Sequence, residues 1–401
     1  MTTSKSQLVQ LLRGEWGGLM TTSPSELRVG DDPGVLQGAQ PHMTPLHLLP
    51  SAVTQPADAQ GRVRCLACVR RCLLRDSAVG YCTAVVNHGG ALYNTAYGVI
   101  AEASVNMMES KPVYHYAPGA RTLSLGGLGC NLHCKFCQNW EIAFRDARDA
   151  AGLAEPNLTP DAAVALALEQ NCRGLAWSHN EPSITPSYTL ESARAARAAG
   201  LFTVFVTNGL CTHEAMTLLG PWIDVYRVDV KSLDAAFYRQ IGALDRISEV
   251  LPIARRAQQE FGAHVETVTN IMPGMNDGDE HLARLAGRIV ELLGADTPWH
   301  LTTYVPYAFM TNVPTTPPES LARAKAIGQR AGLRFIYTDS LADPEGANTR
   351  CPRCGALVIE RSRNRVIVHA LTARGACAAC DEPLGIRPTS ARVGVSARDA
   401  V

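Results

Sequence analysis

Three cysteines in one short loop offer the clearest chemistry in this sequence. Cys130, Cys134 and Cys137 have the spacing C-x3-C-x2-C and follow directly on a glycine-rich stretch. A cubane iron–sulfur cluster has four irons, so three thiolates can hold it and leave one iron open to bind a small molecule. An open coordination position is what allows a metal centre to act as a catalyst. Zinc is the alternative, but it usually takes four ligands, and the fourth would come from elsewhere, for example from His133.

A second cysteine set lies upstream. Cys65, Cys68, Cys72 and Cys82 have the spacing C-x2-C-x3-C-x9-C, which gives four soft ligands in a compact segment. Four thiolates suit either a closed tetrahedral zinc site or a fully ligated auxiliary iron–sulfur cluster. Because thiolates are good ligands for both, the spacing alone leaves the two metals evenly weighted.

A third set lies near the C-terminus. Cys351, Cys354, Cys377 and Cys380 form two C-x2-C pairs about twenty residues apart, a pattern typical of a zinc ribbon. Rubredoxin-like iron is the alternative metal. Arg361 and the arginines near it lie between the two pairs, and we expect such charges to form a solvated face rather than a nucleic-acid contact.

The bulk properties indicate a neutral globular protein of more than one module. The chain has 401 residues, with 37 Lys and Arg against 37 Asp and Glu. A net charge of zero gives no general attraction to nucleic acid or to an anionic membrane. No apolar stretch is long enough to span a bilayer, and the first residues lack the apolar core of a signal peptide. With 13 cysteines in metal-type spacings, we expect a cytoplasmic metalloprotein.

The elements that must position the first loop alternate between strand and helix from about residue 121 to residue 340. Strand patterns lie at 121–125, 175–178, 202–206, 223–230, 265–271 and 300–305. The spacers between them are long enough for helices, which predicts an α/β fold with a parallel sheet or barrel. Functional loops in such folds lie at the C-terminal ends of the strands.

Polar side chains gather at those strand ends. Glu181 follows the second strand, Asn208 follows the third, and Asp229 and Lys231 close the fourth. A helix N-cap or a surface ion pair is the simpler role for any one of them. Their joint placement at one edge favours a binding site that offers carboxylates, a cation and an amide.

The cysteine loop resembles that of the radical S-adenosylmethionine (SAM) superfamily, because it reads C-x3-C-x-aromatic-C with Phe136 as the aromatic residue. The longer run Cys-Gln-Asn-Trp-Glu-Ile at 137–142 is similar to the AmmeMemoRadiSam group, whose members are related to the pyruvate formate-lyase activating enzyme. The resemblance covers roughly residues 62 to 387.

The resemblance implies a fold and a reaction. The fold is a partial (β/α)6 barrel, in which Cys130, Cys134 and Cys137 hold a [4Fe–4S] cluster and SAM binds the open iron. The reaction is reductive cleavage of SAM to a 5′-deoxyadenosyl radical, which abstracts hydrogen from a substrate. The resemblance also implies an electron donor, such as a flavodoxin or a ferredoxin.

The resemblance further implies which residues contact the cofactors. Glu181 stands in the place of the family's Gly-Gly-Glu, which binds the methionyl amino group, while His179 and Asn180 replace the two glycines. Asp229 and Lys231 match an Asp-x-Lys pattern near the SAM carboxylate and ribose. Together with Asn208, which is expected from its place at a strand end, and Phe136 of the cysteine motif, the full set of expected cofactor contacts is Phe136, Glu181, Asn208, Asp229 and Lys231.

Five segments are expected along the chain. They are an irregular extension at 1–60, a cysteine-rich metal-binding segment at 61–118, the partial barrel at 119–340, a zinc-ribbon-like module at 341–390 and a tail at 391–401. The expected function is hydrogen abstraction, activase-like on a protein substrate, with small-molecule abstraction or methylthiolation as variants of the same chemistry. The alternative from another class is an iron–sulfur or zinc scaffold for redox sensing or nucleic-acid binding, although zero net charge disfavours nucleic acid.

Overall fold

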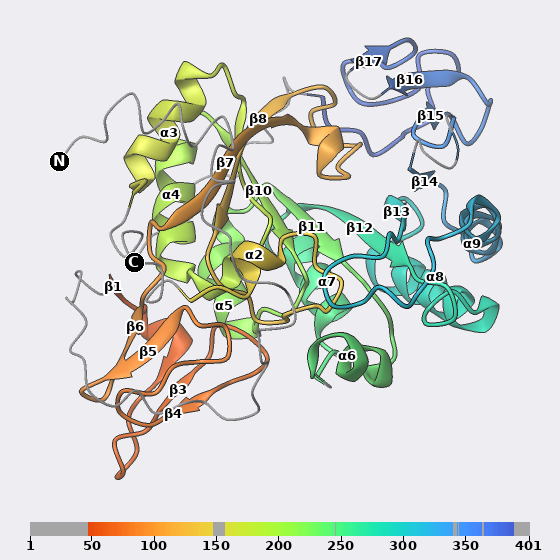
Figure 1. Cartoon of the computed structure of the whole chain (residues 1–401). Helices are drawn as coiled ribbons and strands as arrows, with labels where there is room; N and C mark the ends of the chain where they lie inside the picture. The colour runs from red at the N-terminus through yellow and green to blue at the C-terminus, as the bar shows by residue number, and fades with distance from the viewer. Residues whose placement is uncertain are drawn as a thin grey trace.

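The computed structural model describes residues 47–146, 157–244, 246–339, 343, 345–362 and 365–388. Its centre is an eight-stranded sheet with the order β14-β13-β12-β11-β10-β9-β8-β7 (Figure 1). The strands are β7 Ile100–Met107, β8 Arg121–Gly127, β9 Gly174–Trp177, β10 Phe202–Thr207, β11 Val225–Asp229, β12 His264–Ile271, β13 Trp299–Thr303 and β14 Ile336–Thr338. The tail expected at 391–401 and the first 46 residues of the expected N-terminal extension lie outside the described residues.

Parallel pairing runs from β8 to β14, and only β7 is antiparallel to its neighbour. The expected α/β fold with a parallel sheet is confirmed. The six expected strands are β8 to β13, and β7 and β14 extend the sheet at its two edges. Each strand lies beside the one before it in sequence. The described sheet is open, because β7 and β14 are its two edges, and the C-terminal ends of its parallel strands share one rim.

Helices connect the parallel strands. They are α3 Pro160–Glu169, α4 Pro186–Ala198, α5 His213–Leu219, α6 Ala235–Gly242, α7 Val250–Gln259, α8 Asp279–Leu293 and α9 Pro318–Arg330, and a short α2 Trp140–Ala143 follows the cysteine loop. Several begin at a side chain that accepts a backbone N–H of the first turn: Thr159 for α3, Thr212 for α5 and Asp234 for α6. The caps of α5 and α6 follow closely on the ends of β10 and β11, so the chain turns from strand to helix at short range there.

The cysteine-rich segment forms two small antiparallel sheets. Their strands are β1 His47–Leu48, β2 Thr54–Gln55, β3 Val63–Cys65, β4 Leu73–Leu74, β5 Val85–His88 and β6 Ala91–Asn94, in the orders β1-β6-β5 and β2-β3-β4. Strands β1 and β2 lie before residue 61 and pair with strands after it. The boundary suggested by the sequence at residue 60 therefore cuts through both sheets.

The C-terminal module is a three-stranded sheet of β15 Thr349–Arg350, β16 Leu357–Ser362 and β17 Arg365–Val368. The expectation that Arg361 is solvated is wrong, since the residue is 4% exposed. Its guanidinium donates to the hydroxyl of Thr349 at 2.7 Å and to the carbonyl of Tyr114 at 2.7 Å, and it pairs with Glu109 at 3.5 Å. Because residues 109–114 precede β8, the module is fastened to the end of the sheet opposite the rim (Figure 1).

Candidate functional site

The three cysteines of the first motif lie in the loop that follows β8. Burial raises the pKa of the Cys130, Cys134 and Cys137 thiols to about 12. All three are therefore neutral near pH 7 and must lose protons to bind a metal. Among the described residues, only the C-terminal four-cysteine set brings its sulfur atoms all within 4.8 Å of one another. The three loop thiols are thus spread more widely than the ligands of a single small ion.

Gly129 allows the backbone behind this loop to pack closely. Its φ is 82°, and a Cβ at this position would lie 2.2 Å from the carbonyl oxygen of Cys82. A side chain cannot be accommodated at that distance. The cysteine-rich segment therefore lies directly against the loop.

Asn180 fixes the loop backbone. Its Oδ1 accepts the Gly127 N–H at 3.2 Å, and its Nδ2 donates to the Gly129 carbonyl at 2.9 Å. Neither contact is possible for the glycine that the family pattern has at this position. Asn180 was absent from the predicted site, and the signal for it was an amide side chain where glycine was expected.

Glu181 is buried at the rim, directly after β9. Its carboxylate accepts the Ser183 N–H at 3.1 Å, the Asn208 N–H at 2.9 Å and the Thr207 hydroxyl at 2.8 Å. Burial raises the pKa of this carboxyl, and the hydrogen bonds oppose the rise. A carboxylate has about four acceptor positions, so the three internal donors leave about one for a ligand.

Asn208 joins this end of β10 to the cysteine loop. Its Oδ1 accepts the Leu210 N–H at 3.1 Å, which identifies its Nδ2 as the donor to Asn131 Oδ1 at 2.7 Å. The Nδ2 of Asn131 is then a donor, and among the described residues this buried atom has no hydrogen-bond partner. The amide next to Cys130 thus keeps a donor free for an acceptor that the protein itself does not supply.

Arg227 and Asp229 of β11 and Lys231, two residues beyond its end, form a line of charges that leads to the rim. Asp229 pairs with Arg227 at 2.5 Å and with Lys231 at 3.0 Å. Burial acts to raise the pKa of the Asp229 carboxyl, but the two cations outweigh it and lower the pKa. Two cations against one carboxylate leave one excess positive charge, which suits an anionic group of a ligand. Arg227 was missed, although the i, i+2, i+4 spacing on one strand face was visible in the sequence.

The predicted residues meet on one rim. Burial dominates the thiol pKa values of Cys134 and Cys137, yet Lys231 is close enough to oppose the rise in both. Burial also dominates the pKa of Cys130, and the nearby Glu181 carboxylate adds to the rise. The ring of Phe136 lies 5.8 Å from the Lys231 amino nitrogen. The loop after β8 and the ends of β9, β10 and β11 therefore face a common space.

His133 does not take the place of a fourth ligand. Its ring lies 4.6 Å from that of Tyr81 and 4.7 Å from that of Phe144. Burial, helped by the Arg70 cation, lowers its pKa to about 4. The imidazole packs between aromatic rings, and it is not part of any close ligand group among the described residues.

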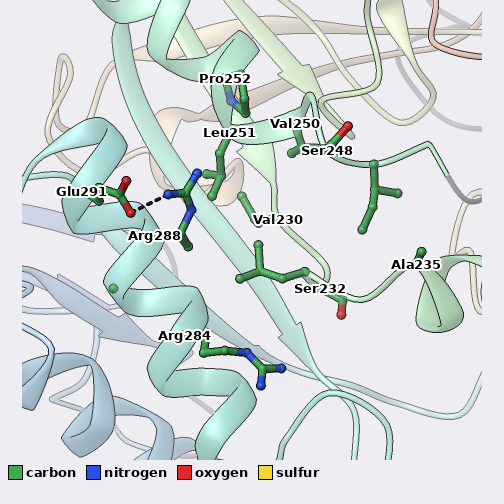
Figure 2. Close-up of a pocket in the computed structure, with 13 residues that line it drawn as sticks. Val230, Ser232, Ala235, Ser248, Val250, Leu251, Pro252, Arg284, Arg288 and Glu291 are labelled. Atoms are coloured by element: carbon green, nitrogen blue, oxygen red, sulfur yellow. Dashed lines mark hydrogen bonds and ion pairs between the residues drawn. The ribbon is translucent and has the colours of Figure 1, made fainter.

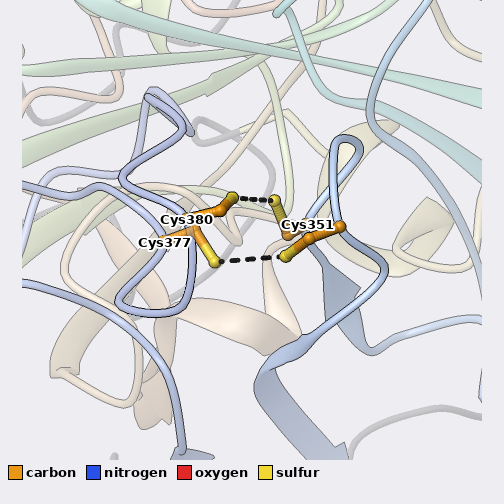
Figure 3. Close-up of side chains that lie close together, drawn as sticks. Cys351, Cys377 and Cys380 are labelled. Atoms are coloured by element: carbon orange, nitrogen blue, oxygen red, sulfur yellow. Dashed lines mark hydrogen bonds between the residues drawn. The ribbon is translucent and has the colours of Figure 1, made fainter.

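The C-terminal cysteines form a group that could hold a metal (Figure 3). The sulfur atoms of Cys351 and Cys380 are 3.6 Å apart, and those of Cys354 and Cys377 are 3.8 Å apart. A tetrahedral ion with metal–sulfur bonds of about 2.3 Å requires sulfur atoms about 3.8 Å apart. Burial acts to raise the pKa of Cys351, but the N–H groups of Cys354 and Arg353 outweigh it and lower the pKa to about 7.

The upstream cysteines surround a small cavity instead. Cys65, Cys68, Cys72 and Cys82 line a space of about 10 Å³ together with Arg70. Burial raises the pKa of Cys65 and Cys68 to about 12. The four thiols face a common space, but their sulfur atoms do not all lie within 4.8 Å of one another.

A large cavity of about 810 Å³ lies apart from these groups, where helices cover the sheet (Figure 2). It is lined by Val230 and Ser232 of the segment after β11 and by Arg288 and Glu291 of α8, which form an ion pair at 2.5 Å. None of the predicted site residues lines it. The cavity is therefore not the space that the cysteine loop faces.

Comparison with known proteins identifies the family. The radical SAM superfamily model matches residues 125–286. An uncharacterised protein of Methanocaldococcus jannaschii is 32% identical over 328 residues, which cover 81% of this chain and 96% of that protein. The chain belongs to the radical SAM superfamily. This family uses a [4Fe–4S] cluster and SAM.

Other similarities of this radical SAM protein are partial. The isethionate sulfite-lyase activating enzyme of Nitratidesulfovibrio vulgaris is 28% identical over 120 residues, which cover 30% of this chain and 39% of that enzyme. A solved domain of a pyruvate-formate lyase-activating enzyme from Bacteroides vulgatus shares 17% identity with a TM-score of 0.35, over 41% of this chain and 98% of that domain. Among the described residues of the radical SAM protein, none of the helices has both the length and the apolar character needed to cross a bilayer.

Proposed function

We propose that this protein is a SAM-cleaving enzyme whose reaction centre is the loop of Cys130, Cys134 and Cys137. The observation that carries the proposal is the donor set: three thiols in one loop, spread more widely than the ligands of one ion, on the same rim as a carboxylate and an excess cation. The set fits a cubane cluster, since it leaves one coordination position open. When bound, a [4Fe–4S] cluster supplies the electron that cleaves SAM to methionine and a 5′-deoxyadenosyl radical for hydrogen abstraction.

The rim residues bind and orient the methionyl part of SAM. Glu181 has about one acceptor position left for the amino group of SAM. The excess positive charge beside Asp229 favours binding of the SAM carboxylate at Lys231. Asn208 keeps Asn131 in place beside Cys130, and the Phe136 ring covers the apolar side of the space, in contact with the Tyr304 ring at 5.8 Å. Together these groups hold the ligand out of water.

The substrate that we propose is a protein segment, in an activase-like reaction. The support is the partial similarity to an enzyme named as an activating enzyme and two exposed apolar side chains that follow β13 at the rim. These are Val305, which is 45% exposed, and Tyr307, which is 43% exposed. Exposed apolar residues beside a site provide a surface on which a peptide can dock. A ferredoxin- or flavodoxin-type protein is the proposed electron donor.

For the C-terminal module we propose a structural zinc ion held by Cys351, Cys354, Cys377 and Cys380. The sulfur spacing of 3.6 and 3.8 Å supports a single tetrahedral ion. The module lies at the end of the sheet opposite the rim, so its metal is too remote to take part in the reaction.

The test of SAM cleavage is made without oxygen. The protein is reconstituted with iron and sulfide, dithionite and SAM are added, and 5′-deoxyadenosine is measured. We expect product from the wild type and none from Cys134→Ala, while Cys172→Ala, a buried cysteine outside the three sets, keeps activity as the matched control. An iron–sulfur scaffold would be favoured instead if the cluster is reducible but yields no product, and if SAM does not change its electron paramagnetic resonance (EPR) spectrum. Steeply salt-dependent RNA or DNA binding would mark that scaffold as a nucleic-acid protein.

A further inference from the structure

We propose that Cys65, Cys68, Cys72 and Cys82 hold a second, fully ligated [4Fe–4S] cluster, and that this cluster passes single electrons to the three-cysteine site. The ligand assignment stands on its own geometry. The electron-transfer role rests on the function proposed above.

The C-terminal cysteine set provides a reference for the sulfur spacing of a single-ion site. The C-terminal set has all four sulfur atoms within 4.8 Å of one another, whereas the Cys65 set, which the structure fully describes, does not. A zinc ion with bonds of about 2.3 Å draws its sulfurs together so closely that no water-sized space remains between them. The Cys65 set instead surrounds a space of about 10 Å³, about the least that admits one water molecule. A cubane puts an iron and an iron–sulfur bond between its centre and each thiolate, so its four thiolates lie farther apart than those of a single ion.

A free buried donor points to an anionic group at the same place. Asn131 is 1% exposed, and its Nδ2 has no partner among the described residues. The amide lies beside the Cys68 thiol: burial raises the pKa of that thiol, and Asn131, as a hydrogen-bond donor toward it, opposes the rise. A buried amide donor without an acceptor is costly, and sulfide or thiolate sulfur of a cluster would satisfy it. The Arg70 guanidinium, which also lines the cavity, supplies a compensating positive charge.

The two cysteine sites are in direct contact through the backbone. The Cys82 carbonyl lies against Gly129, one residue before Cys130. The Arg70 side chain donates to the carbonyl of Asn131 at 2.6 Å, and the Val69 N–H donates to Leu210 at 2.9 Å. The upstream set is thus held against both the cysteine loop and the loop that follows β10. Such proximity is what single-electron transfer between two centres requires.

One member of the set faces outward. Cys65, Cys68 and Cys82 are buried, whereas Cys72 is only partly buried and its neighbour Leu73 is 40% exposed. An external iron–sulfur or flavin protein can therefore approach at Cys72. The donor loses one electron, the second cluster gains it and then gives it to the first site, and no proton or covalent bond is exchanged.

The test uses the full chain, reconstituted without oxygen, with iron and acid-labile sulfide counted and EPR spectra recorded with and without SAM. We expect about eight cluster irons in the wild type, and about four in the triple variant Cys130→Ser/Cys134→Ser/Cys137→Ser, with a signal that SAM does not change. A triple variant without sulfide but with zinc beyond that of the C-terminal set would overturn the assignment. A wild type with the full iron count but no SAM-sensitive signal refutes the function proposed for the three-cysteine site and leaves the second cluster standing.

Cys72→Ser keeps the test decisive if the triple variant does not fold, because this cysteine is the least buried of the four. We expect it to lose iron while the SAM-sensitive signal persists, and an unchanged iron count would overturn the assignment. When a reduced [4Fe–4S] ferredoxin is mixed with this variant, the time course for reduction of the three-cysteine site should lack the fast phase of the wild type. Equal rates in variant and wild type would overturn the electron-transfer role.

Discussion

Replacing Gly129 with alanine tests the contact between the two cysteine sites. The new Cβ would lie 2.2 Å from the Cys82 carbonyl oxygen, whereas ordinary contact begins at 3.4 Å, so one backbone must move by 3.4 − 2.2 = 1.2 Å. Overpacking of this kind costs about 1–3 kcal/mol, and the positive φ of 82° adds about 1 kcal/mol for a residue with a Cβ. The expected loss of unfolding free energy is therefore about 2–4 kcal/mol.

Gly262→Ala is the matched control, because its φ is 72° but nothing lies within 4 Å of the new Cβ. It should cost only the conformational part, about 1 kcal/mol. Unfolding by urea without oxygen gives both values, and sulfide content after reconstitution shows whether the metal sites still form. Gly129→Ala should unfold at lower urea than the control and bind less sulfide. Equal midpoints and equal sulfide in the two variants would refute the inferred packing of the cysteine-rich segment on the loop.

Three further predictions concern charge, pH and metal. Asp229→Asn leaves Arg227 and Lys231 without their carboxylate. Because the Asp229 side chain is 26% exposed, urea unfolding should show a loss of about 1–3 kcal/mol, and an unchanged midpoint would mean that water already solvates these cations. Burial lowers the pKa of His115 from 6.5 to about 3. As the pH falls from 6.5 to 3, the imidazole therefore takes up a proton in the unfolded chain but not in the folded one. Stability should fall there by at most about 5 kcal/mol, and acid titration of His115→Gln should lack this part of the loss. Cys354→Ser should lower bound zinc by about one ion per chain and lower the melting temperature, and full zinc content would contradict a four-thiolate site.

Local signals were sufficient for the central fold and for the residues of the rim. Apolar runs at 202–206 and 265–271 correspond to β10 Phe202–Thr207 and β12 His264–Ile271. The alternation of strands and helices predicts the parallel arrangement, and that arrangement predicts that Glu181 and Asp229 lie on one rim. The short β14 was missed because three residues carry too little pattern.

Contacts between distant segments could not be predicted in this way. Arg361 has the sequence surroundings of a surface residue, and only its meeting with Tyr114 and Glu109, about 250 positions away, buries it. Asn180 likewise acquires its role from the loop after β8. The sequence does not decide the metal at Cys65, Cys68, Cys72 and Cys82. Sequence spacing shows that the four cysteines can reach one site, but the distances between their sulfur atoms depend on how the whole segment packs.

The position of Arg70 has a consequence for how the protein is made. Its guanidinium donates to the Gly242 carbonyl, 172 residues further along the chain, at 2.9 Å. At a synthesis rate of about 5–20 residues per second, this partner leaves the ribosome roughly 10 to 30 s after Arg70 does. During that interval the upstream thiols have no barrel to pack against and are open to oxygen and to the wrong metals. On the proposed assignment, the two cysteine sites can therefore close only after α6 has left the ribosome, so iron and sulfide would be delivered to a chain that already extends beyond residue 242.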